Sequence, residues 1–200
     1  MKIKPVVNVA RLPAYSFGHR SLTWWGTMGM ILIEGTVFAL LIVTYFYLRG
    51  RVPHWPPHLA PPDLWPGTLN TVILLVSAVP NEWVKRAAER QRLRTVQVGL
   101  VVSLAFAVAS LVTRIFEFRV LHCRWDTNAY GSVVWTTLGL HTAHLLTDAL
   151  DTVVLTVLMF TRPIEGRRFS DVSDNSIYWY FVIGAWLPLY AVLYLAPRVL

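Results

Sequence analysis

Cysteine and charged residues are both scarce in this 200-residue sequence. The single cysteine, Cys123, excludes a disulfide within the chain and a cysteine-rich metal cluster. Charged residues make up 14% of the chain, against about a quarter in average soluble proteins, whereas hydrophobic residues make up 55%. The mean hydropathy is +0.49. This composition excludes an ordinary soluble domain and indicates a membrane protein.

Most of the sequence consists of long apolar runs. A bilayer core about 30 Å thick needs roughly 20 apolar residues in helical form, and five stretches separated by charged or Pro/Gly-rich segments reach that length. We therefore predict an all-α integral membrane bundle, a single domain over residues 1–200. Its five transmembrane helices are predicted over residues 24–48, 64–84, 96–118, 131–160 and 177–196.

The basic residues predict how the chain sits in the membrane. The net charge of +7 comes from short clusters between the apolar runs and not from a continuous basic face, so we expect no nucleic-acid partner. With a cytoplasmic N-terminus, twelve Lys and Arg residues flank the helices inside and six flank them outside, as the positive-inside rule requires. An odd number of spans then places the C-terminus in the periplasm. The inside set is Lys2, Lys4, Arg11, Arg20, Lys85, Arg86, Arg90, Arg92, Arg94, Arg162, Arg167 and Arg168.

Glu34 is an acid near the middle of the first predicted helix. It is the eleventh residue of that helix, about 15 Å along its axis at about 1.5 Å per residue. A charge near the bilayer centre costs at least about 2.5–3.5 kcal/mol, so its carboxyl group needs a partner or must be neutral. Two interpretations stay open: a proton-responsive or lipid-contacting carboxyl, and a neutral acid hydrogen-bonded to a neighbouring helix for packing.

The fourth predicted helix carries a polar stripe. His141, His144, Asp148 and Asp151 follow one another at intervals of three or four residues, which places them on one helix face, and Thr137 continues the face by one more turn. We expect this face to turn toward the bundle or a partner subunit. The pattern favours a hydrogen-bonded seam between helices over a proton or water pathway. A metal site is the least favoured, because the stripe has two histidines and no HExxH motif.

Two further residues are predicted to pair. Arg114 and Glu117 lie three residues apart near the outer end of the third predicted helix, so they are expected to form an ion pair on one face. The sequence contains no nucleophile with its base and no phosphate-binding loop. Its six histidines, four of them outside the predicted spans, are too few to ligate two hemes and a copper. We predict no catalytic residue and no metal site in this chain.

Five sequence blocks in order resemble those of cytochrome c oxidase subunit III, the third subunit of the heme-copper oxidases. The resemblance covers about residues 24–198 and looks like the short bacterial form, which has five helices where seven are usual. The blocks are WWGTMGMILIEGTVFALLIVTYFYLR, LNTVILLVSA, FEFRVL, YGSVVWTTLGLHTAH and YWYFVIGAWLPLY.

The resemblance implies a supporting subunit in a bacterial cytoplasmic membrane. Subunits I and II would be its partners, with hemes and copper held by partner subunits, and phospholipid would bind in a cleft between helices. It also implies roles in assembly, proton uptake and stability during turnover of a complex that passes electrons from cytochrome c to oxygen and pumps protons.

The resemblance also matches individual residues of this chain to positions of the family's motifs. Glu34 stands at the family's buried membrane glutamate, His141 and His144 at its HxxH motif, and Glu117 at the acid before an aromatic residue. The chain departs from the pattern at four positions, because Asp148 replaces a glycine, Arg114 a glutamine, Tyr180 a histidine and Ile183 an aspartate. Together with the additional Asp151, these changes predict that polarity moves from the fifth helix to the fourth.

Two other kinds of protein stay open. The equivalent subunit of a quinol oxidase or a nitric oxide reductase would differ only in an electron donor that other subunits bind. A small transporter would instead use the His/Asp stripe to line a substrate path, and it would work when reconstituted alone.

Overall fold

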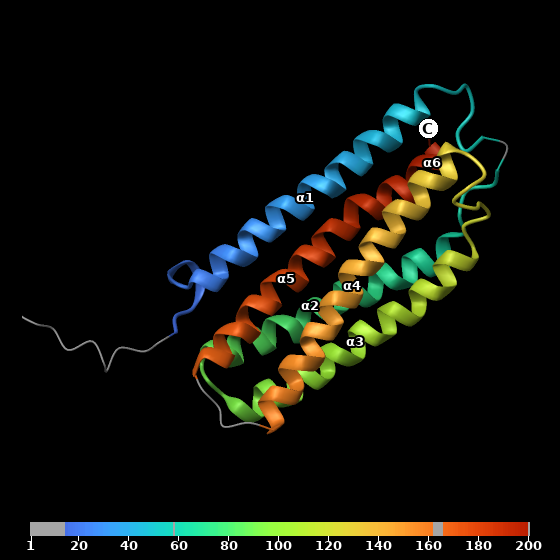
Figure 1. The fold of residues 1–200 in the computed structure, drawn as a ribbon. Helices are drawn as coiled ribbons and strands as arrows, with labels where there is room; N and C mark the ends of the chain where they lie inside the picture. The colour runs from blue at the N-terminus through green and yellow to red at the C-terminus, as the bar shows by residue number, and fades with distance from the viewer. Residues whose placement is uncertain (1–14, 58, 162–165, 200) are drawn as a thin grey trace, which may run out of the picture.

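The computed structural model describes residues 15–57, 59–161 and 166–199, and all regular structure in this part of the chain is helical (Figure 1). This confirms the predicted all-α class. Lys2, Lys4, Arg11 and Arg162, four of the residues used to orient the chain, lie outside the described residues. The helices are the short 3-10 helix η1 (Gly18–Arg20), α1 (Leu22–Arg49), α2 (Leu64–Glu89), α3 (Leu93–Arg119), α4 (Ala129–Thr161), α5 (Gly166–Tyr190), the π-helical turn η2 (Ala191–Leu195) and α6 (Ala196–Val199).

The first four long helices each contain one of the predicted apolar runs, and the fifth run, 177–196, extends from α5 through η2 to the start of α6. The largest difference is in α5, which begins at Gly166 whereas the apolar run begins at residue 177. The additional turns are polar in sequence, but Phe169 and Val172 are buried there against Val96 and Leu155. Burial of these two side chains explains why the helix continues past the end of the apolar run.

Four helices are long and apolar enough to cross a membrane: α1, α3, α4, and the continuous helical segment Gly166–Val199. The remaining long helix, α2, has 26 residues but a more polar sequence, with Asn70, Asn81 and a charged last turn. Its two asparagines are buried against the other helices, since both are 5% exposed or less. The bundle therefore consists of four apolar helices and a fifth of similar length.

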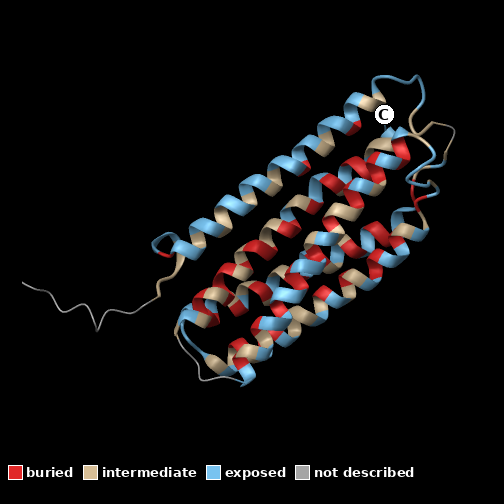
Figure 2. Ribbon diagram, viewed as in Figure 1, coloured by how far each residue is buried: buried red, intermediate tan, exposed pale blue. Residues whose placement is uncertain are grey.

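The helices run side by side along one long axis, with α1 at the edge of the bundle (Figure 1). Only Phe38 and Tyr45 of α1 are buried, whereas α4 and α5 each bury a whole face (Figure 2). The main hydrophobic core is formed mostly by α4, α5 and η2, around Trp186 and Leu138. Because α1 buries two side chains over its whole length, most of its apolar surface faces outward.

Two glycines allow the helices to approach closely. A β-carbon on Gly67 of α2 would lie 2.6 Å from the ring of Tyr194, and one on Gly99 of α3 would lie 2.3 Å from the side chain of Val84. Real β-carbons do not approach other atoms this closely, so both positions need glycine for packing. Close to Tyr194, α5 contains Pro188, and the π-helical turn η2 follows. The C-terminus lies at the end of the bundle opposite the beginning of α1 (Figure 1).

Candidate functional site

The polar stripe of α4 runs from the interior of the bundle to its surface. Thr137, His141 and Asp148 are buried, His144 is partly buried, and Asp151 is exposed in the isolated chain. The inward orientation predicted for this face therefore holds for its first part, whereas Asp151 lies at the rim. Along its length the stripe contacts two separate groups of polar residues and a cavity.

Arg114, Glu117 and His141 form the first group, here called the sealed cluster. The predicted ion pair is present, with Arg114 Nη1 donating to Glu117 Oε2 over 2.5 Å, and both side chains are at most 1% exposed. Arg114 Nη2 also lies 2.9 Å from His141 Nδ1. Because a guanidinium can only donate, His141 Nδ1 must accept, and the proton of a neutral His141 is therefore on Nε2. That nitrogen donates to the carbonyl oxygen of Val182 over 3.1 Å.

Aromatic residues of the C-terminal segment close the sealed cluster. The Arg114 guanidinium carbon lies 4.1 Å from the centre of the Trp186 ring, and Tyr194 donates to Glu117 over 3.1 Å. The positive charge is thus paired with a carboxylate and covered by an aromatic face, which stabilises cations. Neither aromatic residue was identified from the sequence, since aromatic residues are frequent along all the apolar runs. The cluster joins α3, α4 and α5 through groups that solvent does not reach.

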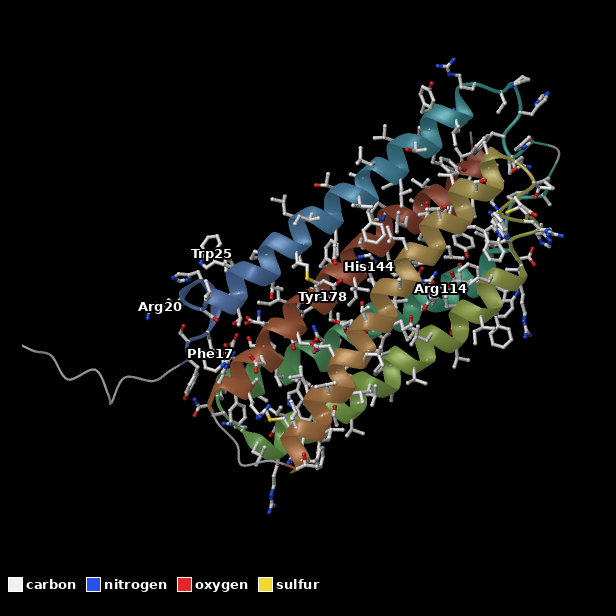
Figure 3. All side chains as sticks on the ribbon, in the orientation of Figure 1. Phe17, Arg20, Trp25, Arg114, His144 and Tyr178 are labelled. Atoms are coloured by element: carbon white, nitrogen blue, oxygen red, sulfur yellow. The ribbon has the colours of Figure 1, made fainter. Side chains whose placement is uncertain are left out.

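Glu34 and His144 form the second group, together with Tyr178. Tyr178 of α5 donates its hydroxyl to Glu34 Oε2 over 2.8 Å, and His144 Nε2 lies 3.5 Å from Glu34 Oε1. The Glu34 and His144 side chains are 21% and 12% exposed, so both are largely shielded. Figure 3 shows Tyr178 and His144 in the middle of the bundle, with Arg114 farther toward the C-terminal end. Glu34 therefore has the hydrogen-bonded partner that the packing interpretation requires.

The hydrogen bonds of His144 show which of its ring nitrogens faces Glu34. His144 Nδ1 lies 2.7 Å from the carbonyl oxygen of Leu140, and since a carbonyl only accepts, Nδ1 carries a proton. Nε2, which lies 3.5 Å from Glu34 Oε1, is therefore the ring nitrogen that faces the carboxyl group of α1.

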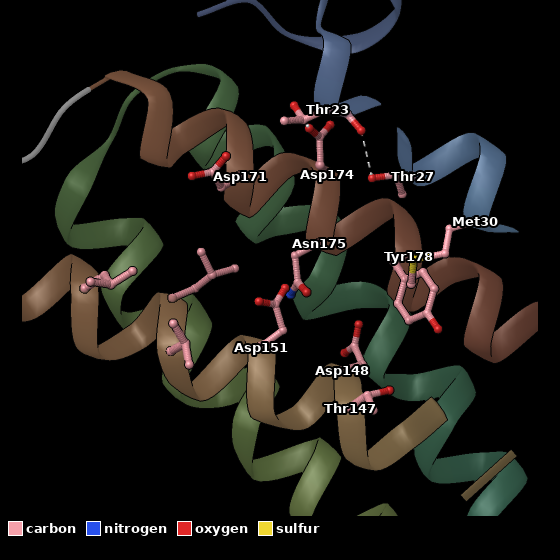
Figure 4. Close-up of a pocket in the computed structure, with 13 residues that line it drawn as sticks. Thr23, Thr27, Met30, Thr147, Asp148, Asp151, Asp171, Asp174, Asn175 and Tyr178 are labelled. Atoms are coloured by element: carbon pink, nitrogen blue, oxygen red, sulfur yellow. Dashed lines mark hydrogen bonds between the residues drawn. The ribbon is translucent and has the colours of Figure 1, made fainter. Parts of the chain in front are cut away.

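The third feature is an acidic cavity of about 490 Å³ between α1, α4 and α5 (Figure 4). Four aspartates line it, Asp148 and Asp151 from α4 and Asp171 and Asp174 from α5. The last two were missed from the sequence because they precede the apolar run of the fifth helix. Their spacing of three residues, the same as that of His141 and His144, was a signal that they share a helix face.

The fifth helix is more polar in its contacts than the sequence predicted. It supplies Tyr178 to Glu34, Tyr180 to Glu82 over 2.8 Å, and the two aspartates of the acidic cavity. The prediction that polarity moves from this helix to the fourth is wrong in that respect, because Tyr178 and Tyr180 make polar contacts from within the motif on which it was based, and the two aspartates precede that motif. Among the described residues, no group of three or more His, Cys, Asp or Glu side chains is arranged to hold a metal ion.

Comparison with known proteins identifies similar sequences over nearly the whole chain. The family model described as "Cytochrome c oxidase subunit III" matches residues 19–197. A protein of Thermostichus vulcanus named "Cytochrome c oxidase subunit 3" is 25% identical, with 90% of each chain covered. A "Probable cytochrome c oxidase subunit 3" of Mycobacterium tuberculosis is 24% identical, covering 90% of this chain and 91% of that protein. The "Heme-copper oxidase subunit I+III" of Aeropyrum pernix is 26% identical over 88% of this chain, which corresponds to 22% of that longer protein.

Proposed function

Since this chain belongs to the cytochrome c oxidase subunit III family, we propose that it is the non-catalytic third subunit of a proton-pumping oxidase that passes electrons from cytochrome c to oxygen. It is a subunit III of a heme-copper oxidase. In this proposal it contacts subunits I and II, which hold the hemes and copper. It supports their assembly, proton uptake and stability during turnover, with phospholipid bound along its helices.

The observation that carries this proposal is the family match from residue 19 to residue 197, which includes all five long helices. The Aeropyrum pernix relative supports a contact with subunit I, because its name describes subunits I and III as parts of one polypeptide. A fused pair keeps its two parts in fixed proportion and close together. We propose that this chain, which is separate from subunit I, lies next to it in the same way.

The proposed membrane topology has five crossings in a bacterial cytoplasmic membrane, with a cytoplasmic N-terminus and a periplasmic C-terminus. The positions of the α1 start and the C-terminus at opposite ends of the bundle support an odd number of crossings (Figure 1). The excess of basic residues on the side assigned to the cytoplasm supports the orientation. For α2, the burial of its asparagines supports a crossing inside the bundle, where other helices shield its polar groups from lipid.

The first experiment tests membership of the complex. The chain, carrying an affinity tag, is purified from its membranes in mild detergent, and the visible spectrum and the subunit masses are recorded. We expect reduced-heme absorption bands and two larger subunits, with the untagged strain as control. Reduction of the immobilised complex by cytochrome c and not by a quinol identifies the electron donor. Heme-free purification combined with transport by the chain alone in vesicles would contradict the proposal and favour a transporter.

The second experiment tests whether the carboxyl group of Glu34, which lies beside Tyr178 and His144, contributes to turnover. Glu34→Gln keeps the shape of the side chain but cannot exchange a proton. We expect slower steady-state oxygen reduction and a several-fold faster loss of activity during turnover.

Glu82→Gln is the matched control for this experiment. Glu82 also accepts a hydrogen bond from a tyrosine of α5, but its side chain is 37% exposed and pairs with Arg86. This control should behave as wild type. Unchanged turnover, proton stoichiometry and inactivation rate in Glu34→Gln would leave Glu34 with a role in packing only.

A further inference from the structure

The acidic cavity continues to the end of the bundle at which α1 begins. It shares Thr23 and Asp171 with a neighbouring cavity of about 420 Å³, whose lining includes the exposed Arg20 and Arg167. Thr23 lies in the first turn of α1, and Asp171 lies in the polar first turns of α5, before its apolar run. Because basic residues and helix ends mark the border of a membrane, the shared residues place one mouth of the acidic cavity where the membrane meets water.

The other end of the acidic cavity reaches Tyr178, which donates to Glu34 inside the apolar part of the bundle. The lining residues of α1 run from Thr23 to Met30, and those of α5 run from Asp171 to Tyr178. At about 1.5 Å per residue, each range corresponds to roughly 10 Å of helix axis. In Figure 4, Asp171 lies at one end of the cavity, and Met30 and Tyr178 lie at the other. The cavity therefore leads from the helix ends to the partner of a largely shielded carboxyl group.

The lining of the acidic cavity favours water over lipid chains. Four aspartates and three threonines contribute to it, and Asp151 is exposed on a helix that is long and apolar enough to cross a membrane. Met30, Val154 and Leu158 also line it, but acyl chains in this space would meet the carboxyl groups, at a cost of at least about 2.5 kcal/mol for a charged one. A volume of about 490 Å³ holds several water molecules, each of which occupies about 30 Å³.

We propose that the acidic cavity is a water-filled vestibule that connects the hydrogen bond between Tyr178 and Glu34 to the aqueous phase at the end of the bundle where α1 begins. A tyrosine hydroxyl donates one hydrogen bond and accepts others, so Tyr178 can bond to Glu34 and to water at the same time. Protons of that phase thus reach Glu34 without crossing lipid. Asp148 and Asp151, which depart from the subunit III pattern, belong to the acidic wall of the vestibule.

The vestibule depends on the membrane-spanning bundle of this chain and not on the electron donor of the complex. Only its assignment to the cytoplasmic side rests on the topology proposed above. The experiment therefore measures the presence of water and the side of entry separately.

Access of water is measured as the rate at which introduced cysteines react with a charged methanethiosulfonate that does not cross membranes. The reagent reacts with the thiolate, which forms in water and not in hydrocarbon. Cys123, the single cysteine of the chain, is first replaced by serine. The assembled oxidase in inverted membrane vesicles is treated with 2-(trimethylammonio)ethyl methanethiosulfonate, and modification of this chain is followed by mass spectrometry. Unfolding in sodium dodecyl sulfate shows that every introduced thiol was free.

Thr147→Cys tests the vestibule, and Leu150→Cys is the matched control. Thr147 lines the acidic cavity, whereas Leu150 is not among its described lining residues. Leu150 is nevertheless 56% exposed and lies nearer to the end of α4 at Thr161. We expect Thr147→Cys to react at least roughly tenfold faster than Leu150→Cys. Equal rates would mean that lipid or a partner subunit fills the cavity, and would overturn the inference.

Glu34→Cys tests the inner end of the vestibule against Ile33→Cys at the adjacent position. Ile33 is 69% exposed and the Glu34 side chain is 21% exposed, so exposure alone predicts the faster reaction for Ile33→Cys. A water path through the vestibule predicts the reverse, with Glu34→Cys several-fold faster. If Glu34→Cys were the slower variant, water would not reach Glu34 and the inference would be wrong. Met30→Cys, one turn earlier and in the cavity lining, takes its place if Glu34→Cys does not assemble.

The side of entry is tested by comparing inverted vesicles with intact cells. We expect modification of Thr147→Cys in inverted vesicles, which expose the cytoplasmic face, and not in cells. The opposite result would overturn the proposed orientation and still support the vestibule, so the two failures are distinguishable.

The acidic wall is tested by comparing the cationic reagent with an anionic methanethiosulfonate at Thr147→Cys. Asp151→Asn should lower the preference for the cationic reagent several-fold. Asp126→Asn is the matched control, because Asp126 is an exposed aspartate that pairs with Arg124 on the outer loop, and it should leave the preference unchanged. An equal preference in the two variants would mean that the reagent does not pass the aspartates, which contradicts the proposed route.

Discussion

The sealed cluster and the acidic cavity lie in one bundle and share the polar stripe of α4, yet the first pairs opposite charges and the second gathers groups of the same charge. In the sealed cluster, Arg114 and Glu117 carry opposite charges at a distance of 2.5 Å and are closed off by Trp186 and Tyr194. In the acidic cavity, four aspartates of the same sign surround an open volume, and two of their buried oxygens are unpaired.

This difference separates a closed ion pair from an open group of like charges. In the sealed cluster the opposite charges compensate each other, so no external ion is needed, although Arg114 Nε and Glu117 Oε1 have no hydrogen-bond partner among the described residues. A group of like charges is complete only with protons or a cation, so the acidic cavity stays open to exchange. The Glu34–His144 contact lies between the two, since it joins an acid and an imidazole but shields them incompletely.

The largest effect is expected from breaking the sealed cluster with Arg114→Met. The change leaves Glu117 buried without its counter-charge and removes the donor to His141 Nδ1. We expect the free energy of unfolding to fall by about 3–5 kcal/mol. It is measured on the purified protein in mild detergent by titration with a denaturing detergent, followed by far-ultraviolet circular dichroism.

Two further variants test whether the loss of stability comes from the broken ion pair. Arg119→Met removes an exposed arginine five residues farther along α3 and should change stability by no more than about 0.5 kcal/mol. Arg114→Met combined with Glu117→Leu replaces both charges and should regain most of the loss. If Arg114→Met were no more harmful than Arg119→Met, the ion pair would not stabilise the bundle.

An intermediate effect is expected for Tyr178→Phe, which removes the hydrogen bond to Glu34 while the ring stays in place. We expect a loss of about 0.5–1.5 kcal/mol, because Glu34 then has only His144 as a partner. The same denaturant titration measures it. Tyr180→Phe is the control, since its acceptor, Glu82, is exposed enough for water to replace the tyrosine. Equal losses in the two variants would show that shielding of Glu34 adds nothing to stability.

The smallest effect on stability is expected for Asp148→Asn in the acidic cavity. Asp148 donates and accepts no hydrogen bond among the described residues, and the change removes its repulsion with Asp151. The free energy of unfolding should stay within about 0.5 kcal/mol of wild type or rise slightly. A loss comparable to that of Arg114→Met would mean that Asp148 has a structural partner and that the contrast with the sealed cluster is wrong.

Much of the fold was predictable because long apolar runs have few alternatives in a membrane. The helix positions and the Arg114–Glu117 pair follow from periodicity within one segment, and the ion pair needs no information about other helices. The partners of Glu34 were not predictable, since Tyr178 is 144 residues away in sequence. The start of α5 was misplaced for a related reason: its polar first turns are helical because Phe169 and Val172 pack on other helices.

Sequence alone determined the membrane class, the number of long helices, the family resemblance and the helix face on which His141, His144, Asp148 and Asp151 lie, because these depend on hydrophobicity and on spacing along the chain. Only the tertiary structure decided which of those residues are sealed and which line a cavity. That outcome depends on how closely neighbouring helices approach, and the approach is set by side chains such as those around Gly67 and Gly99, which lie far apart in the chain.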